Sequence, residues 1–410
     1  MAGAGPADDT APYLAEALTR HLGRPVSLTE IGLAEPFPVP APDWRADTLA
    51  ALADLGRGDL DVERRRALSP AAYSAAALAV PGSEWWTQRA EQSAIRPATG
   101  RRRVGRGDLD AVRDMVAMFS RIDQRHGGGH ARAAVVQYLT TDVSTYLGGR
   151  FTDDQVRREM FAAASELAYL SGGMAFDNAE HAIAQRYFTL SVSLAAEADD
   201  APMAGHVLRA MAHQAADLGH GRQAVNLANA SMDGPRYASA APRERALLGV
   251  VRARALAANG QPKAAAAALL RAGDDLAAAT PGHDEPGRVF FFGEASLAHE
   301  TACTLRDTGD LGGALREFRH SVRTRKAATF TRTHAVTLGY LGSVQARQGA
   351  IEEACATWSR ALDAMDGIHS ARARRTTADM RRALSPVRGR GIPAVAELDA
   401  RAAAYLTESA

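Results

Sequence analysis

The chain has 410 residues, of which 46% are apolar and 6% aromatic, and its 48 Lys and Arg nearly balance its 47 Asp and Glu, for a formal net charge of +1. This length suits two or three modules or one elongated repeat array, and the alanine-rich composition predicts an all-α protein with closely packed helices. The balanced charge argues against autonomous DNA binding, and two cysteines, Cys303 and Cys355, exclude a disulfide framework.

Short helical stretches separated by proline-rich and glycine-rich connections occupy the first hundred residues. Apolar residues recur at helical spacing through Ala11–Leu33, and prolines at 36, 38, 40 and 42 then predict an extended linker. Further short helices are predicted at Thr48–Leu55 and Glu63–Val80. We find neither a signal-peptide pattern nor a run of about 18 apolar residues, so we expect a cytoplasmic protein without a membrane span.

Three consecutive glycines stand between His126 and His130. Two histidines four residues apart are a candidate metal pair, but each intervening glycine disfavours the helix that would align them by about 1 kcal/mol. A phosphate-binding loop would follow a strand, whereas here a helix precedes the glycines. The stretch therefore predicts a flexible joint where the N-terminal helices meet the rest of the chain, with His130 or Arg132 as possible ligand contacts at the following helix start.

An internal repeat is the most informative pattern in the chain. Four turn glycines each have a small residue seven positions before, alanine five positions after, an apolar residue nine after and a small residue twelve after. The glycines are Gly219, Gly260, Gly309 and Gly349, and the alanines are Ala224, Ala265, Ala314 and Ala354. An earlier unit is predicted to turn at Asp177 and Asn178, with Ala182 at the alanine position. The pattern resembles the tetratricopeptide repeat and predicts a right-handed superhelical solenoid of helical hairpins.

The repeat register predicts which side chains face the concave groove. Counted from the small residues Ala212, Ala253, Ala302 and Gly342, positions −3, −2, +1 and +4 point inward, and His206 lies six before the first. The polar residues predicted to bind a ligand are His206, Arg209, His213, Arg254, His299, Glu300, Arg306, Tyr340 and Ser343. Arginines among apolar walls suit an anionic or peptide-like ligand. A metal site or an acid–base pair of histidine with Glu300 stays open, although neither HExxH nor GxSxG occurs.

The chain resembles actinobacterial transcriptional regulators that join an N-terminal helix-turn-helix of the xenobiotic-response-element type to a C-terminal tetratricopeptide sensor. The stretches that carry the resemblance are Leu14–Leu33, Asp123–Leu139, Ala184–Phe188 and Leu218–Ala228. A helix-turn-helix needs two helices, and only about ten residues precede the first matching segment. We therefore expect residues 1–35 to be a remnant of that domain, 36–107 a linker and short helical region, 108–385 the repeat domain and 386–410 a helical tail.

These patterns predict a regulatory protein whose groove binds a peptide, a small molecule or a protein partner. DNA contact is expected only where an upstream helix-turn-helix is restored, no membrane contact or cofactor is expected, and homodimerisation stays open. Two alternatives remain: a scaffold or antagonist of a full-length regulator, and an atypical enzyme or enzyme helper that uses groove His, Glu and Tyr side chains.

Overall fold

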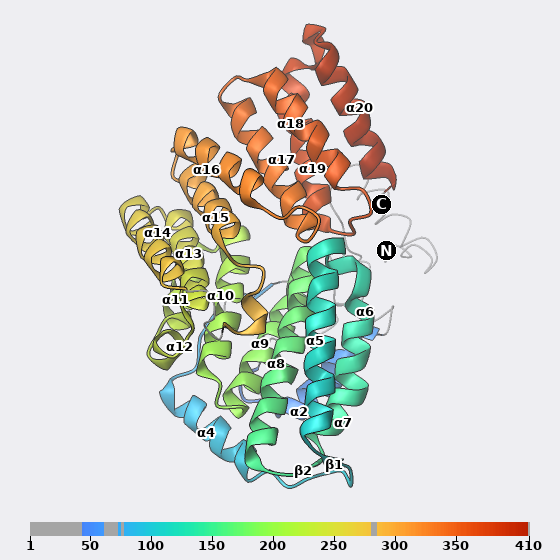
Figure 1. The fold of residues 1–410 in the computed structure, drawn as a ribbon, viewed down its shortest axis with the longest axis vertical. Helices are drawn as coiled ribbons and strands as arrows, with labels where there is room; N and C mark the ends of the chain where they lie inside the picture. The colour runs from blue at the N-terminus through green and yellow to red at the C-terminus, as the bar shows by residue number, and fades with distance from the viewer. Residues whose placement is uncertain (1–42, 61–72, 75–77, 280–284, 409–410) are drawn as a thin grey trace, which may run out of the picture.

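The computed structural model describes residues 43–60, 73–74, 78–279 and 285–408. These residues are almost entirely helical, and successive helices pair into hairpins that stack along a curved array (Figure 1). The N-terminal elements are α2 (Thr48–Leu60), α4 (Ser83–Ala94), β1 (Arg103–Val104), α5 (Arg106–His126), α6 (Gly128–Tyr138), the π-helical turn η2 (Leu139–Val143), α7 (Ser144–Leu147) and β2 (Arg150–Phe151). The predicted helix at Thr48–Leu55 is thus confirmed within α2, whereas most of Glu63–Val80 lies outside the described residues.

The rest of the described chain is a solenoid of antiparallel hairpins. In chain order it contains α8 (Asp154–Asp177), α9 (His181–Glu197), α10 (Ala201–Asp217), α11 (Gly221–Ser231), α12 (Pro235–Ala238), α13 (Pro242–Ala258), α14 (Pro262–Ala277), the 3₁₀ turn η3 (Gly287–Val289), α15 (Glu294–Asp307), α16 (Leu311–Thr324), α17 (Thr331–Arg347), α18 (Ile351–Ala364), α19 (Ala371–Leu384), the 3₁₀ turn η4 (Ser385–Arg390) and α20 (Pro393–Glu408). The hairpins are α8–α9, α10–α11, α13–α14, α15–α16, α17–α18 and α19–α20. The all-α solenoid predicted from the repeats is confirmed.

The four repeat glycines form the hairpin turns. Their φ angles are 82° at Gly219, 71° at Gly260, 93° at Gly309 and 85° at Gly349. L-residues with a side chain rarely adopt this left-handed conformation, so glycine is the residue that lets the second helix fold back at once. The alanines five positions later are fully buried, and in the last of these units Gly342 admits the Trp358 ring, whose Nε1 would lie 2.5 Å from an added Cβ.

The earliest hairpin of the array, α8–α9, corrects one detail of the predicted register. Its helix does end at Asp177, but the left-handed turn residue is Ala179, with φ of 62°. Counting from Ala179 places Ala184, which is fully buried, at the alanine position instead of Ala182. Gly172 then takes the small position, where an added Cβ would lie 2.7 Å from the Phe188 ring. In the other units a glycine at the turn identified the repeat, whereas in this unit alanine takes the left-handed turn position.

The glycine run joins the two ends of the array. Gly127, with φ of 86°, separates α5 from α6, and an added Cβ would lie 2.6 Å from the carbonyl oxygen of His369. The amide of Gly129 donates to the same carbonyl at 3.0 Å, and the amide of His369 donates to the carbonyl of His126 at 2.9 Å. The predicted flexible joint is therefore a closely packed turn that binds the loop between α18 and α19, since these glycines permit close backbone approach.

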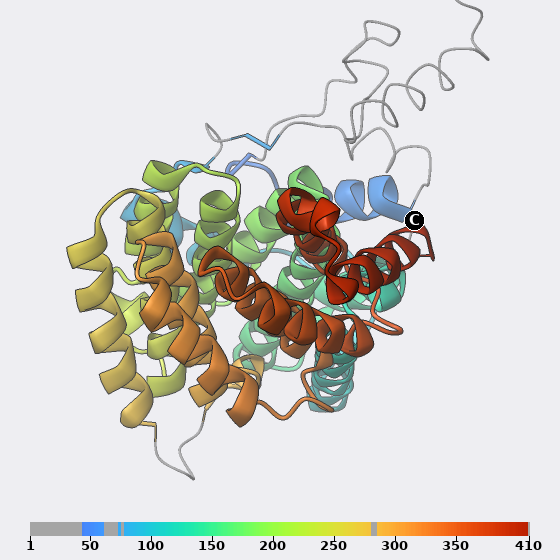
Figure 2. The same ribbon diagram turned by 90° about the horizontal axis from the view of Figure 1, so that it is seen from above.

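Closure of the array also involves α17, which packs against α5. Seen from above, the hairpins curve round so that the α17–α20 region lies over the α5–α6 end (Figure 2). One large core runs from Leu52 on α2 to Phe292 after η3, and a separate core fills the C-terminal hairpins around Trp358. The inner face of this closed curve holds the site described next.

Candidate functional site

A cavity of about 200 Å³ lies on the inner side of the curve. Its wall combines α5, the first helices of successive hairpins and the segment around η3. The charged and histidine residues of the wall are Asp123, Glu166, Asp177, Arg209, His213, Arg288, His299, Glu300, Arg325, Arg332 and Arg372. Apolar surface comes from Tyr169, Phe176, Leu247, Val251, Val336 and the three consecutive phenylalanines 290–292. A concave site that combines apolar wall with convergent charged groups is typical of small-ligand binding.

Four of the eleven residues predicted to bind a ligand line this cavity. They are Arg209, His213, His299 and Glu300. The other seven lie outside its wall and take part in packing or in ion pairs behind it: His206, Arg254, Arg306, Tyr340, Ser343, His130 and Arg132. The predicted inward residues therefore line the cavity on α10 and at the start of α15. On the later turns of α15 and on α17 they do not.

His206 is fully buried behind the cavity wall on α10. Its Nδ1 lies 3.0 Å from Oε1 of Glu244, and its Nε2 lies 2.9 Å from Nη2 of Arg209. Arginine only donates, so Nε2 accepts and the ring proton sits on Nδ1, where it is donated to Glu244. Burial, together with the Arg209 charge, lowers the pKa of His206 to about 3, although Glu244 acts in the opposite direction. The neutral imidazole thus connects a buried carboxylate to an arginine of the cavity.

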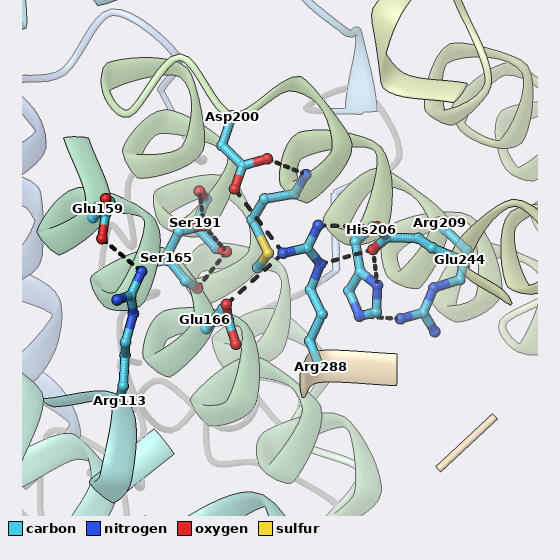
Figure 3. A network of polar contacts seen from close by, with 11 residues as sticks. Arg113, Glu159, Ser165, Glu166, Ser191, Asp200, His206, Arg209, Glu244 and Arg288 are labelled. Carbon is cyan, nitrogen blue, oxygen red and sulfur yellow. Dashed lines mark hydrogen bonds and ion pairs between the residues drawn. The ribbon is translucent and has the colours of Figure 1, made fainter. Parts of the chain in front are cut away.

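Arg288 at η3 is the main contact between the loop and the hairpins, and Figure 3 shows its guanidinium reaching between α8, α10 and α13. Its Nε and Nη2 donate to the two oxygens of Glu244 at 2.7 and 2.9 Å. Its Nη1 lies 3.8 Å from Glu166 and 4.0 Å from Asp200. Burial opposes ionisation of Glu244, yet the hydrogen bond from His206 and the charge of Arg288 lower its pKa to about 2. The sequence showed only a long loop here, so Arg288 was missed.

A second cluster surrounds His213, which lies between α10, α13 and α15. Nη1 of Arg254 lies 2.7 Å from Nε2 of His213 and 3.2 Å from Glu300, and its Nη2 donates to Asp217 at 3.0 Å. Arg372 of α19 lies 3.5 Å from Asp217. Burial lowers the pKa of His213 to about 4. Burial opposes ionisation of Glu300, but Arg254 and His213 hold its pKa at about 2, so it is a carboxylate already held by Arg254.

A third cluster ties α17 to α5 and α8 at the edge of the cavity. Arg332 contacts Asp123 at 3.0 Å and Asp177 at 2.8 Å. Burial raises the pKa of Asp123, whereas the pKa of Asp177 is lowered despite burial, because Arg332 and the amide of Gly128 both stabilise its charge. Asp177 accepts from that amide at 3.0 Å. The cluster therefore links the glycine turn to the last hairpins.

Two arginines of the cavity wall bind only uncharged groups. Arg209 donates to the hydroxyl of Tyr169 at 2.7 Å and contacts the neutral His206. Arg325 donates to the carbonyl of Ala295 at 2.9 Å and to Oγ of Ser321 at 3.1 Å. Their exposed fractions are 6% and 7%. No carboxylate of the described residues lies within ion-pair distance of either guanidinium.

The remaining predicted residues have local roles. Nδ1 of His299, whose pKa burial lowers to about 3, lies 2.9 Å from the Thr337 hydroxyl. The Arg306 guanidinium lies 5.2 Å from the centre of the Tyr340 ring, and Ser343 donates to a carbonyl one turn earlier in its own helix.

At the glycine turn, Arg132 forms buried ion pairs with Asp59 and Glu180, which fasten α6 to α2 and to the α8–α9 turn. His130 lies beside His126 and His369, with ring centres 4.9 and 6.0 Å apart. Within the described ranges, no group of three or more His, Cys, Asp or Glu side chains is arranged to hold a metal ion.

Comparisons with known proteins add the following. A family model described as the SP15 N-terminal domain matches residues 1–34, which lie outside the described residues. The helix-turn-helix remnant expected there stays a prediction. No curated protein matches the chain. Among solved structures, the crystal structure of a Rap protein complexed with competence and sporulation factor is similar to it, with 11% identity, 74% of this chain and 100% of the Rap chain covered, and a TM-score of 0.37. None of the helices in the described ranges is long and apolar enough to cross a membrane. By its own turns and hairpins, the chain is an all-α solenoid of tetratricopeptide-like repeats.

Proposed function

We propose that this chain is a regulatory protein whose cavity binds a small molecule or the end of a peptide. The observation that supports the proposal best is the composition of the cavity wall. It brings charged side chains from α5, from the inner helices of successive hairpins and from the η3 segment into one cavity. Titratable groups with strongly shifted pKa values gather at functional sites, and Glu166, His213 and His299 of this wall are shifted in that way, which favours ligand recognition over simple packing.

Ligand binding would regulate through the shape of the array. In a solenoid each hairpin contacts mainly its neighbours, so curvature depends on weak nearest-neighbour interfaces. Here α5 and α17, far apart in sequence, share the cavity wall. A ligand that contacts both makes contacts only in the closed shape and shifts the population toward it, which is the differential affinity that regulation requires.

The resemblance to transcriptional regulators makes control of transcription the proposed output. Residues 108–385 would be the sensor, and residues 1–35, 36–107 and 386–410 the remnant, the linker region and the tail. DNA contact would require a helix-turn-helix upstream of Ala11, and a protein partner is the alternative receiver of the signal.

The test is native mass spectrometry of the protein purified from its own host. We expect a bound mass that is released on denaturation. Gly173 lines the cavity on α8 and an added Cβ would meet no atom within 4 Å, so Gly173→Leu places a larger side chain in the cavity from an open backbone position. Gly273 on α14 is equally open but lies away from the cavity, which makes Gly273→Leu the matched control. Retention of the ligand by Gly173→Leu, or its absence from the wild-type protein, would overturn the proposal.

A further inference from the structure

We propose that the ligand of this cavity is a small anion with two acidic groups, and that Arg209 and Arg325 bind one group each. The inference rests on the proposed function, because it concerns the same cavity. It starts from the pairing of charges across the wall.

The carboxylates of the cavity are already held by arginines. Arg332 contacts both Asp123 and Asp177. Glu300 lies 3.2 Å from Arg254, and Glu166 lies 3.8 Å from Arg288. Each of these acids therefore lies beside an arginine, and Arg332 and Arg288 each contact more than one acid.

Arg325 differs from these arginines. It follows α16 and contacts a carbonyl and serine hydroxyls, and no carboxylate of the described residues lies within ion-pair distance of it. Its Nε is buried without a hydrogen-bond acceptor among the described residues, as are those of Arg254 and Arg332. Burial lowers its pKa to about 10, so the guanidinium stays charged at neutral pH although nearby acids compensate it little. A buried charge without a counter-ion is unfavourable, and an anion in the cavity would supply one.

Arg209, on α10, also has only uncharged partners among the described residues. Its guanidinium lies 5.6 Å from the Tyr169 ring centre and donates to that residue's hydroxyl, while its other contact is the neutral His206. Its Nε is likewise buried without an acceptor among the described residues. Arg209 and Arg325 come from different hairpins and share no partner residue, so we assign one acidic group of the ligand to each.

The cavity also limits the ligand's size and kind. A volume of about 200 Å³ is below the roughly 300–1,000 Å³ typical of pockets for drug-sized ligands. Planar guanidinium groups match carboxylates, which they bind through two parallel hydrogen bonds. Leu247 and Val251 supply apolar wall for a short linking chain. The chemistry is two carboxylates on a short chain, as in a free dicarboxylic acid or in the C-terminal Glu or Asp of a peptide.

The experiment is calorimetric titration of the full chain with linear dicarboxylic acids of four to eight carbons, their monoamides and their diamides. The dipeptide Ala-Glu and its C-terminal amide form a second arm that separates a peptide end from a free diacid. We expect one diacid, or Ala-Glu, to bind about 10- to 100-fold more tightly than its monoamide, since each charged hydrogen-bonded contact is lost in turn. Arg209→Gln and Arg325→Gln should each weaken diacid binding by a similar factor and abolish the preference of the diacid over its monoamide. Arg323→Gln, at an exposed position on the same helix end, is the control and should change nothing.

Diacids that bind no better than diamides to the wild-type protein would overturn the inference, and that comparison does not depend on the folding of any variant. Different results would reject the proposed function and the proposed dianionic ligand. A neutral or cationic mass that is carried by the host-purified protein and lost from Gly173→Leu would leave the proposed function intact and reject the dianion. An absence of any bound mass or titratable ligand would reject both.

Discussion

The contact between Arg288 and Glu244 allows a direct test of how the η3 segment is fixed to the hairpins. Glu244 is fully buried on α13, and its two oxygens accept from Arg288 at 2.7 and 2.9 Å. Arg288→Met removes the guanidinium but keeps a chain of similar length, which leaves the carboxylate with His206 alone. Loss of one partner of a buried pair costs about 3–5 kcal/mol, so we expect destabilisation of that size, concentrated in α13 and η3.

The assay combines urea denaturation with hydrogen exchange of the α13 amides, because repeat arrays unfold in parts and a single midpoint averages over them. Glu244→Leu in the Arg288→Met background removes the stranded charge, and we expect stability to return to within about 2 kcal/mol of the wild type. Arg113 is the control: it contacts Glu159 at 2.8 Å with half of its side chain exposed, so Arg113→Met should cost less than about 1 kcal/mol.

Two results would refute this reasoning about Arg288. One is an effect of Arg288→Met no larger than that of Arg113→Met. The other is simple additivity of the Arg288→Met and Glu244→Leu effects, because groups that contact one another should couple by several kcal/mol in a double-mutant cycle.

Two further predictions concern packing and pH. Gly342→Ala places a Cβ 2.5 Å from Nε1 of the buried Trp358 and should destabilise the chain by about 1–3 kcal/mol, whereas Gly273→Ala, open on α14, should stabilise it by about 0.5–1 kcal/mol; equal effects in urea denaturation would contradict the repeat register. Burial keeps four histidines neutral when folded, so below the unfolded value of about 6.5 only the unfolded chain takes up protons and stability falls; at pH 5.5 each costs about 1.4 kcal/mol relative to pH 7.5. The pKa of Glu166, raised to about 6 by burial, offsets about 1 kcal/mol of this, so we expect a net loss of about 4–5 kcal/mol, and an unchanged urea midpoint would reject it. The histidines are His181, His206, His213 and His299.

The repeat could be predicted from the sequence because its signal is local. A left-handed turn selects glycine, as at Gly260, and a close helix crossing selects a small residue, as at Ala253, so the hairpins follow from residues a few positions apart. The earliest unit shows the limit of this reasoning. Ala179 takes the left-handed conformation without being glycine, and the two-residue error in the register followed from that exception.

The candidate site was less predictable because closure of the array forms it. The inward face of α10 follows from helical periodicity, and Arg209 and His213 do line the cavity. Arg332 and Arg288 were missed because their partners lie far away in sequence, 209 residues away for Asp123 and 44 for Glu244. Pairing at such separations depends on the curvature of the whole array, which no local pattern records.

Closure also explains how a ligand can act on the glycine turn. Arg332 links Asp123 and Asp177 at the cavity edge, and the amide of Gly128 donates to Asp177. Those two carboxylates line the cavity, so under the proposal an anion bound beside them would compete for Arg332, and the change would reach the turn that holds His369. A ligand at 100 times its dissociation constant stabilises the form it binds by about 2.7 kcal/mol, which is comparable to one buried contact in this cluster. If the proposed ligand binds, we expect the glycine turn to pass a change at the cavity to the last hairpins through its backbone contacts with His369.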